Sequence, residues 1–254
     1  MAKLMTYALA GALAVAFAPV AGLAADLPEP PLLETIPEPI EFGSSWYLRG
    51  DVGYKIYRKP DVRYGGTKYS DEDMKDTGLV GAGVGYKFNN WIRADVTADY
   101  EFKSKMKGRL ICPVAACAQP NGSQLRSREE ADVSAFTTMA NLYADLGTWH
   151  GVTPYVGAGI GASYINVSGY DYTNPNGITG SVRGDKNWSF SWALMAGVGY
   201  EVTDNLTLDV GYRYLNLGDG KTKKTGGGFN GDVPVKIKHL QAHEMRVGVR
   251  YMLD

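Results

Sequence analysis

The sequence predicts an all-β protein, an eight-stranded antiparallel up-and-down transmembrane β-barrel. Three observations predict this fold: apolar and polar residues alternate with period two in eight segments, the connections between these segments are alternately short and long, and aromatic residues gather at both ends of the segments. Period-two alternation directs apolar side chains to one face of a sheet and polar ones to the other, here lipid and lumen.

The first 24 residues have the features of a secretory signal peptide. Lys3 precedes an apolar run from Ala8 to Phe17, and small residues precede a predicted cleavage after Ala24. Residues 25–45 form a leader with prolines at positions 28, 30, 31, 37 and 39, which we interpret as an extended periplasmic tether. The predicted domains are therefore 1–24, signal peptide; 25–45, leader; and 46–254, barrel.

The charge balance argues against a nucleic-acid-binding function. Without Lys3 the chain has 25 basic and 27 acidic residues, so it lacks a polybasic region for nucleic acid. Its 32 glycines and 17 tyrosines suit strands and interfacial girdles better than a helical core. No run approaches about 20 uninterrupted apolar residues, so we expect membrane residence through strands.

The strands can be followed in order. The alternating segments are residues 46–56, 79–88, 91–102, 136–146, 156–164, 188–201, 206–214 and 239–253. The third is the clearest, because Ile92, Val96 and their outward companions are all apolar while Arg93, Asp95 and most of the inward set are polar. Glycines such as Gly83 and Gly159 occupy inward-facing positions of the alternation, where a missing side chain leaves room in a narrow barrel. These glycines do not follow the spacing of a nucleotide-binding loop.

The last strand also carries a predicted assembly signal. Met245 to Leu253 is a strict alternating ribbon, and Arg246, Gly248, Tyr251 and Leu253 are similar to the C-terminal pattern by which outer-membrane barrels are recognised for assembly. We therefore expect the barrel assembly machinery to be a partner.

The connections segregate by length. Short turns are predicted at 89–90, 147–152 and 203–205, and long polar loops at 57–76, 103–131, 167–187 and 218–237. By the layout of such barrels, the short turns are periplasmic and the long loops extracellular. Phe88, Trp91, Trp149 and Tyr200 mark the first rim; the aromatics predicted at the other rim are Tyr54, Tyr100, Phe102, Tyr164, Trp188, Phe190, Tyr212 and Tyr214.

The inward-facing positions of the alternating segments carry charges of both signs. The predicted ion-pair network of the lumen comprises Arg49, Asp51, Arg93, Asp95, Asp99, Glu101, Asp209, Arg213, Glu244, Arg246 and Arg250; Lys55, Asp145 and Glu201 share the parity. Side chains can fill an eight-stranded barrel, and unpaired charges away from water are costly, so we expect these groups to pair and close the lumen. The alternative is a narrow or gated pore.

Other candidate sites are few. Cys112 and Cys117 lie in the longest predicted loop and, in an exported protein, predict a disulfide rather than a metal site. His239 and His243 face outward by parity whereas Ser189 and Ser191 face inward, so no catalytic residues, cofactor or metal are predicted and a lipid-modifying enzyme is the least favoured function. A basic cluster, Lys221, Lys223 and Lys224, is either a solvated loop or a contact for lipopolysaccharide phosphates.

Several motifs together resemble a known family. Ala25-Asp26-Leu27-Pro28, the opening strand Trp46 to Tyr54, the Gly-x-Gly-Tyr strand ends and the closing Val247 to Tyr251 resemble the small porin-like surface proteins of alphaproteobacteria, the Omp25/Omp31 group of the OmpA-like transmembrane barrels. The resemblance implies a structural protein of the Gram-negative outer membrane that maintains the envelope and presents antigenic extracellular loops. For some members it implies haem or host factors as ligands, but no haem ligand can be assigned here.

Overall fold

Period-two alternation becomes twelve antiparallel strands in the part of the chain that the structure describes. The computed structural model describes residues 45–111, 126–224 and 232–253, which all belong to one structural unit, residues 40–254. The predicted signal peptide, the leader apart from Ser45, and the pair Cys112 and Cys117 lie outside these residues.

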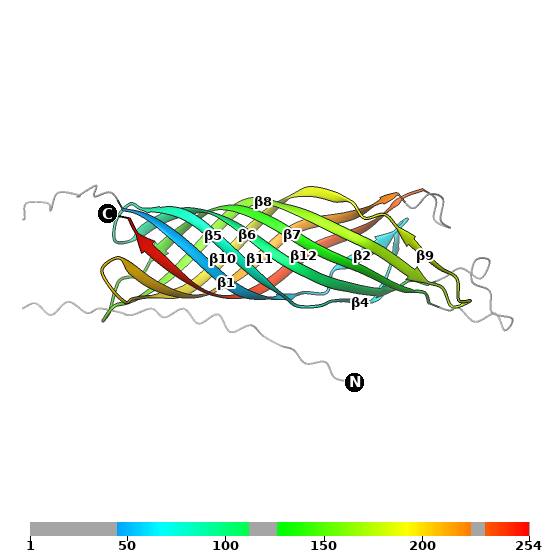
Figure 1. The fold of residues 1–254 in the computed structure, drawn as a ribbon, viewed down its shortest axis with the longest axis horizontal. Coiled ribbons are helices and arrows are strands. Elements are labelled where there is room, and N and C mark those ends of the chain that lie inside the picture. Colours follow the sequence, from blue (N-terminus) through cyan, green and yellow to red (C-terminus); the bar gives the residue numbers. More distant parts are fainter. Residues whose placement is uncertain (1–44, 112–125, 225–231, 254) are drawn as a thin grey trace, which may run out of the picture. The chain divides into compact units, whose positions relative to one another are not determined.

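Eight long strands form a closed ring, which confirms the predicted barrel. In ring order they are β1 (Trp46–Tyr57), β5 (Thr77–Lys87), β6 (Ile92–Arg109), β7 (Arg128–Asp145), β8 (Val152–Thr173), β10 (Lys186–Glu201), β11 (Leu206–Lys224) and β12 (Pro234–Met252). Each strand pairs with the next in the chain, and β12 pairs back with β1 from Tyr47↔Met252 to Tyr57↔Ala242. Figure 1 shows the tilted strands winding around one axis. Within the described residues, no helix is long and apolar enough to cross a bilayer.

The short turns lie where the sequence predicts them. Asn89 closes the turn from β5 to β6 with its side-chain oxygen, which accepts from the backbone N–H groups of Trp91 and Ile92. In the turn from β7 to β8, Gly147 and Gly151 take positive φ values of 100° and 80°, a conformation that glycine adopts without steric cost. In the turn from β10 to β11, the Thr203 hydroxyl accepts from the N–H of Leu206.

The prediction of four long loops is wrong in large part, because most of the residues in these segments form strands that extend the barrel. β6 and β7 pair as far as Gly108↔Glu129, β8 runs to Thr173, and β11 runs to Lys224. Four short strands complete this end: β2 (Asp61–Tyr64) pairs with β12, β3 (Thr67–Lys68) with β2, β4 (Ser70–Met74) with β6, and β9 (Thr179–Val182) with β8. The strands of the barrel therefore extend well beyond the predicted segments, as their length in Figure 1 shows.

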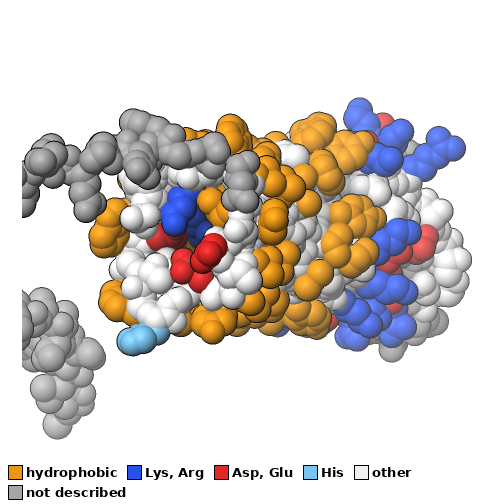
Figure 2. Space-filling view, turned by 60° about the vertical axis from the view of Figure 1, so that its left-hand side comes forward, with side chains coloured by type: hydrophobic (Ala, Val, Ile, Leu, Met, Phe, Trp, Pro, Cys, Tyr) orange, Lys and Arg blue, Asp and Glu red, His pale blue; other side chains and the backbone are white. Residues whose placement is uncertain are grey.

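The outer wall carries a continuous band of exposed apolar side chains. Ile160 and Val210 are 62% and 61% exposed, as expected for side chains that would contact lipid rather than water. Aromatic rings contact one another at both rims, for example Trp46 with Tyr86 and Tyr100 with Phe102, whose centroids are 5.2 and 5.6 Å apart. Figure 2 shows the apolar band between the mouth with the short turns and the opposite end, where Lys and Arg gather.

Candidate functional site

The inner face of the barrel brings the predicted charged residues together. The structure places the following eleven side chains inside, buried or nearly so: Arg49, Asp51, Arg93, Asp95, Asp99, Glu101, Asp209, Arg213, Glu244, Arg246 and Arg250. Lys55 and Asp145 are buried with them. The parity-based expectation for Glu201 is wrong: it is exposed, because it is the last residue of β10 at the rim.

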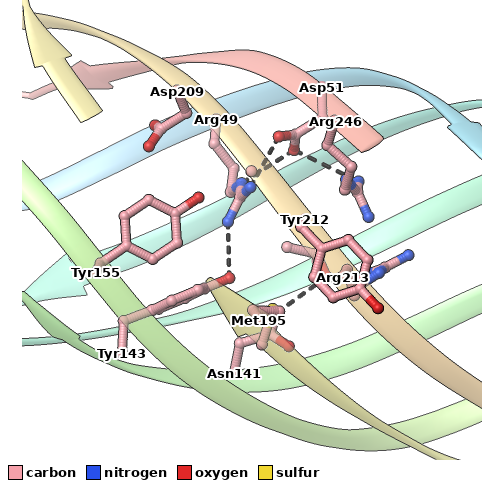
Figure 3. Close-up of a pocket in the computed structure, with 12 residues that line it drawn as sticks. Arg49, Asp51, Asn141, Tyr143, Tyr155, Met195, Asp209, Tyr212, Arg213 and Arg246 are labelled. Atoms are coloured by element: carbon pink, nitrogen blue, oxygen red, sulfur yellow. Dashed lines mark hydrogen bonds and ion pairs between the residues drawn. The ribbon is translucent and has the colours of Figure 1, made fainter. Parts of the chain in front are cut away.

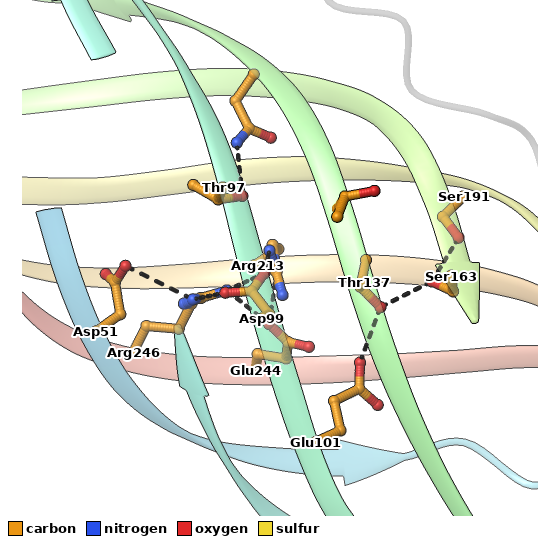
Figure 4. Close-up of polar contacts among 12 residues, drawn as sticks. Asp51, Thr97, Asp99, Glu101, Thr137, Ser163, Ser191, Arg213, Glu244 and Arg246 are labelled. Carbon is orange, nitrogen blue, oxygen red and sulfur yellow. Dashed lines mark hydrogen bonds and ion pairs between the residues drawn. The ribbon is translucent and has the colours of Figure 1, made fainter. Parts of the chain in front are cut away.

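Asp99 on β6 is the hub of this network. Its two carboxylate oxygens lie 2.8 Å from Arg213 Nη1 on β11 and 2.6 Å from Arg246 Nη2 on β12. Glu244 accepts from Arg213 Nε at 2.6 Å and pairs with Lys55 Nζ at 2.9 Å. The hub thus joins β1, β6, β11 and β12 across the lumen (Figure 4).

A second group of polar residues surrounds Arg49. Its guanidinium lies 2.8 Å from carboxylate oxygens of both Asp51 and Asp95 and donates to the Tyr143 hydroxyl at 2.8 Å. The Asn141 amide donates to the other oxygen of Asp95. Arg246 approaches Asp51 to 3.6 Å, which connects this group to the Asp99 hub. Figure 3 shows Arg49, Tyr143 and Asn141 of this group converging from opposite walls.

The end of the lumen nearest the short turns is closed by two further cations. Arg93 pairs with Asp145 at 3.0 Å, and its guanidinium lies 4.0 and 4.6 Å from the ring centroids of Tyr143 and Tyr155. Arg250 pairs with Asp209 at 2.5 Å. Guanidinium groups stack well on aromatic faces, so Arg93 fills the cross-section as well as neutralising Asp145.

Between these groups lies a small polar chamber of about 20 Å³. Asn141 Oδ1, Asp209 Oδ1, Arg213 Nη2 and Arg246 Nε are buried around it without a hydrogen-bond partner among the described residues. Buried polar groups of this kind are normally hydrated. The chamber can therefore hold water.

A chain of hydroxyl groups marks the boundary of the charged layer on the side away from the short turns, here called the upper side. The Thr137 hydroxyl donates to Glu101 at 3.3 Å and lies 2.8 Å from that of Ser163, which lies 2.7 Å from that of Ser191. These four residues come from β6, β7, β8 and β10, and all are fully buried (Figure 4).

Above this boundary the lumen is apolar, which the sequence reasoning missed. The buried apolar core of the upper lumen consists of Val62, Tyr64, Tyr69, Met74, Met106, Leu110, Ala131, Val133, Ala135, Met139, Ile165, Val167, Tyr170, Ala193, Leu215, Leu217, Val235, Ile237 and Leu240. The signal was present: Lys103, Lys105 and Lys107 alternate with Ser104, Met106 and Gly108. In this region the polar side faces outward and the apolar side inward, the reverse of the arrangement in the apolar band.

The segment between β1 and β5 closes the top of this core. Residues 58–76, here called the strap, contain β2, β3 and β4, and they turn Val62, Tyr64, Tyr69 and Met74 inward. The hydroxyl of Tyr69 contacts that of Tyr170 on β8. The strap is therefore packed into the barrel rather than free in solvent.

Glu129 is a carboxylate buried in this upper region, and no ion pair joins it to a cation of the described residues. Glu129 on β7 accepts from the Ser127 hydroxyl at 2.5 Å, with Tyr170 beside it. It lies beyond Phe136, the last apolar outward residue of β7, and therefore outside the apolar band. Burial raises the pKa of the Glu129 carboxyl, and the two hydroxyls offset only part of that shift.

The remaining predicted residues do not form a catalytic group. His243 Nδ1 lies 2.6 Å from the Tyr212 hydroxyl on the outer wall, whereas Ser191 is buried inside. His239 is exposed, and its N–H donates to Asp219. Among the described residues, no cluster of three or more His, Cys, Asp or Glu side chains could hold a metal ion. Of the predicted assembly signal, Arg246 lies inside, Gly248 lies against Asp51, and Tyr251 and Leu253 are exposed.

Comparison with known proteins agrees with this architecture. Residues 10–252 match the family described as outer membrane protein beta-barrel domain. An uncharacterized protein of Brucella suis is 36% identical, with 91% of this chain and 92% of that protein covered. A Rickettsia felis protein described as a "Putative adhesin" is 25% identical, with 84% and 89% covered. The crystal structure of OprG from Pseudomonas aeruginosa superposes with a TM-score of 0.52 at 14% identity, covering 83% of this chain and 96% of that one.

Proposed function

Because the chain belongs to the family of outer membrane protein β-barrel domains, we propose that it is a closed surface protein that stabilises the envelope and presents its extracellular end for recognition. The expected relationship to outer-membrane barrels of alphaproteobacteria is confirmed, and the protein resides in the outer membrane. The end of the barrel opposite the short turns is then extracellular, and the short turns are periplasmic.

The apolar core of the upper lumen carries the proposal. An ion or small polar solute would have to pass the paired charges around Asp99 and then a layer packed mainly with apolar side chains, such as Leu215 and Leu217, which would solvate it poorly. Two unlike barriers in series favour a closed barrel over the alternative of a narrow or gated pore.

The extracellular projection supports a role in recognition. Strands β6, β7, β8, β11 and β12 extend beyond the apolar band, and the strap rigidifies one side of this projection. A rigid platform lowers the entropy lost when a ligand binds. The description of the Rickettsia relative as a "Putative adhesin" points in the same direction.

Lipid, lipopolysaccharide and the barrel assembly machinery are the proposed partners within the membrane. The apolar band supplies the lipid contact, and Tyr251 and Leu253 lie exposed at the end of β12. A lipid-modifying activity is not favoured, because Ser191 and His243 lie on opposite faces of the wall. No observation favours a haem site in the described residues, so no haem ligand is proposed.

The test is single-channel conductance of the refolded protein in a planar bilayer. We expect the wild type to be electrically silent across the voltages that the bilayer tolerates. Steady, reproducible openings would show that the lumen is a pathway. The porin function would then replace the closed-barrel proposal.

A further inference from the structure

Four basic side chains stand directly opposite one another on the outside of the extracellular projection. Lys221 on β11 pairs with Lys236 on β12, Lys236 pairs with Arg63 on β2, and Arg63 pairs with Lys68 on β3. We call Lys221, Lys236, Arg63 and Lys68 the cationic row. All four are exposed, and residues paired across antiparallel strands share a face of the sheet.

The fold fixes this arrangement. Val235 and Ile237 flank Lys236 and are buried in the upper core, as are Val62 and Tyr64 on either side of Arg63. Burial of these neighbours turns the basic side chains outward and holds their register. Like charges placed directly opposite one another destabilise a sheet, so the row has a cost that a ligand of opposite charge would offset.

Within the described residues, a carboxylate pairs with Arg63 but not with the three lysines of the row. Asp61 forms a two-point contact with Arg63, with both oxygen–nitrogen distances at 3.0 Å. The hydrogen bond from Arg63 lowers the pKa of Asp61, and the charges of Arg63, Lys68 and His239 add to this effect. Within the described residues, no carboxylate forms an ion pair with Lys68, Lys221 or Lys236.

A surface groove runs beside the row. It offers about 340 Å³ and is lined by Arg63, Lys236, Lys238, the Gly65-Gly66 turn, Val233 and Pro234. Gly65 and Gly66 have φ values of 55° and 89°, and a Cβ on Gly66 would meet no atom within 4 Å. The turn therefore leaves the groove open, and the groove combines cations with an apolar surface.

We propose that the cationic row and its groove bind an extracellular polyanionic glycan, a sugar chain with repeated sulfate, phosphate or carboxylate groups. With adjacent strands about 4.8 Å apart, the row spans roughly 14 Å and presents its charges in a line. Arginine and lysine bind such oxyanions by charge-assisted hydrogen bonds, and Val233 and Pro234 suit the apolar face of a sugar ring. This inference rests on the proposed function, in which the extracellular end is a recognition surface.

The height of the row above the bilayer favours a free glycan over the phosphates of the outer membrane in which the barrel lies. Lys236 is nine residues along β12 from Met245, which is an outward residue of the apolar band. At about 3.3 Å per residue and a tilt near 40°, the row lies roughly 20 Å above that point. Lipid phosphates lie near the edge of the band, which the exposed rings of Trp188 and Phe190 mark on β10, and Lys221 and Lys236 lie beyond that edge along their strands.

The experiment measures binding of a heparin-derived hexasaccharide to the full-length protein in detergent micelles, by calorimetry at several salt concentrations. We expect salt-dependent binding that weakens at least tenfold in a triple variant, Lys68→Gln, Lys221→Gln and Lys236→Gln. Replacement of the same three lysines by arginine should retain it, because charge and reach are preserved.

A matched control comes from β6. Lys103→Gln, Lys105→Gln and Lys107→Gln remove the same charge from outward positions of the same projection, exposed at Lys103 and Lys105 and partly exposed at Lys107, but Lys107 pairs with Glu130 and Lys105 lies opposite Asp132. We expect this control to change the affinity less than threefold. Equal loss in both triple variants would show general charge attraction and overturn the site.

Two further outcomes would also overturn the proposal. In the first, the hexasaccharide binds the wild type and the triple glutamine variant of the row with the same affinity. In the second, the row binds rough-type lipopolysaccharide but does not bind the hexasaccharide. Conductance of the same preparations separates the two proposals: a silent barrel that does not bind the glycan contradicts this inference alone.

Discussion

Individual glycines on the inner face make space for the charged network. A Cβ on Gly81 would lie 2.1 Å from Asp99 Oδ1 and 2.8 Å from Arg246 Nη2, whereas a Cβ on Gly50, which lies on the outward face of β1, would meet nothing within 4 Å. Both residues lie in paired strands, β5 and β1. The same substitution therefore has opposite consequences at the two positions.

We expect Gly81→Ala to destabilise the folded protein by about 1–3 kcal/mol, because the hub must shift to admit the methyl group. Gly50→Ala should be neutral or slightly stabilising, since alanine reduces the freedom of the unfolded chain. Urea-induced unfolding in lipid vesicles, followed by tryptophan fluorescence, measures both. Equal stability of the two variants would contradict the tight packing at Asp99.

Glu129 makes the stability of the extracellular projection depend on pH. Its pKa is raised in the folded state, so the folded protein holds the proton more tightly than the unfolded chain does. As pH rises from the ordinary value of 4.5 through the raised value, the unfolded chain ionises first and the folded state loses stability. Above the raised value the loss is complete and constant.

We expect Glu129→Gln to remove this decline, so that the variant gains stability relative to the wild type as pH rises above 4.5. Glu130→Gln is the control, because Glu130 is partly exposed and pairs with Lys107 at the surface. Urea midpoints at a series of pH values measure the effect. A wild type and a Glu129→Gln variant with parallel pH profiles would contradict it.

At the residue scale, parity predicted which side chains enter the lumen but not which ones pair. Asp99 and Arg246 are 147 residues apart, and their contact depends on the stagger between strands around the ring. Parity assigns a face to a residue but not a height along the barrel axis. The sequence could therefore predict a charged interior, while the hub at Asp99 required the register of every strand between them.

At the scale of elements, the eight strands and their short turns could be predicted, and the extracellular extensions could not. Alternation resumes at Lys103, Lys105 and Lys107 after a shift of register between Glu101 and Ser104, so that odd positions, which face inward within the apolar band, here face outward. A stretch with charged residues at every second position looks like a polar loop when lipid is assumed to cover the outer face. Once the strand leaves the bilayer, water covers that face and the apolar side turns inward.

The strap is the element most open to a test. Tyr69 is buried in the upper core and touches Tyr170, so Tyr69→Ala removes a large side chain from a packed position. We expect the strap to open more readily by about 3 kcal/mol, which raises the rate of tryptic cleavage within residues 58–76 on the order of a hundredfold.

Thr67→Ala is the control for the strap, because Thr67 is exposed in β3, two residues before Tyr69. Its cleavage rate should stay at the wild-type value while the barrel remains folded in both variants. Rapid cleavage of the wild-type strap would contradict its packing into the core.

At the scale of the whole molecule, two layers close the lumen in series. The lower layer is held by ion pairs around Asp99 and the upper one by apolar packing around Leu215 and Leu217. In a series arrangement the larger resistance governs the current. Opening one layer should therefore leave the other in control.

We expect the charge-balanced pair Asp99→Ala with Arg246→Ala to remain silent in a planar bilayer, because the apolar layer is intact. Leu215→Ser with Leu217→Ser should also remain silent, since the remaining ion pairs still fill the lower lumen. Only the combination of all four substitutions should conduct, as water then spans both layers. Steady openings in the charge-balanced pair alone would show that the apolar core is no barrier, and the closure of this barrel would then depend on its ion pairs.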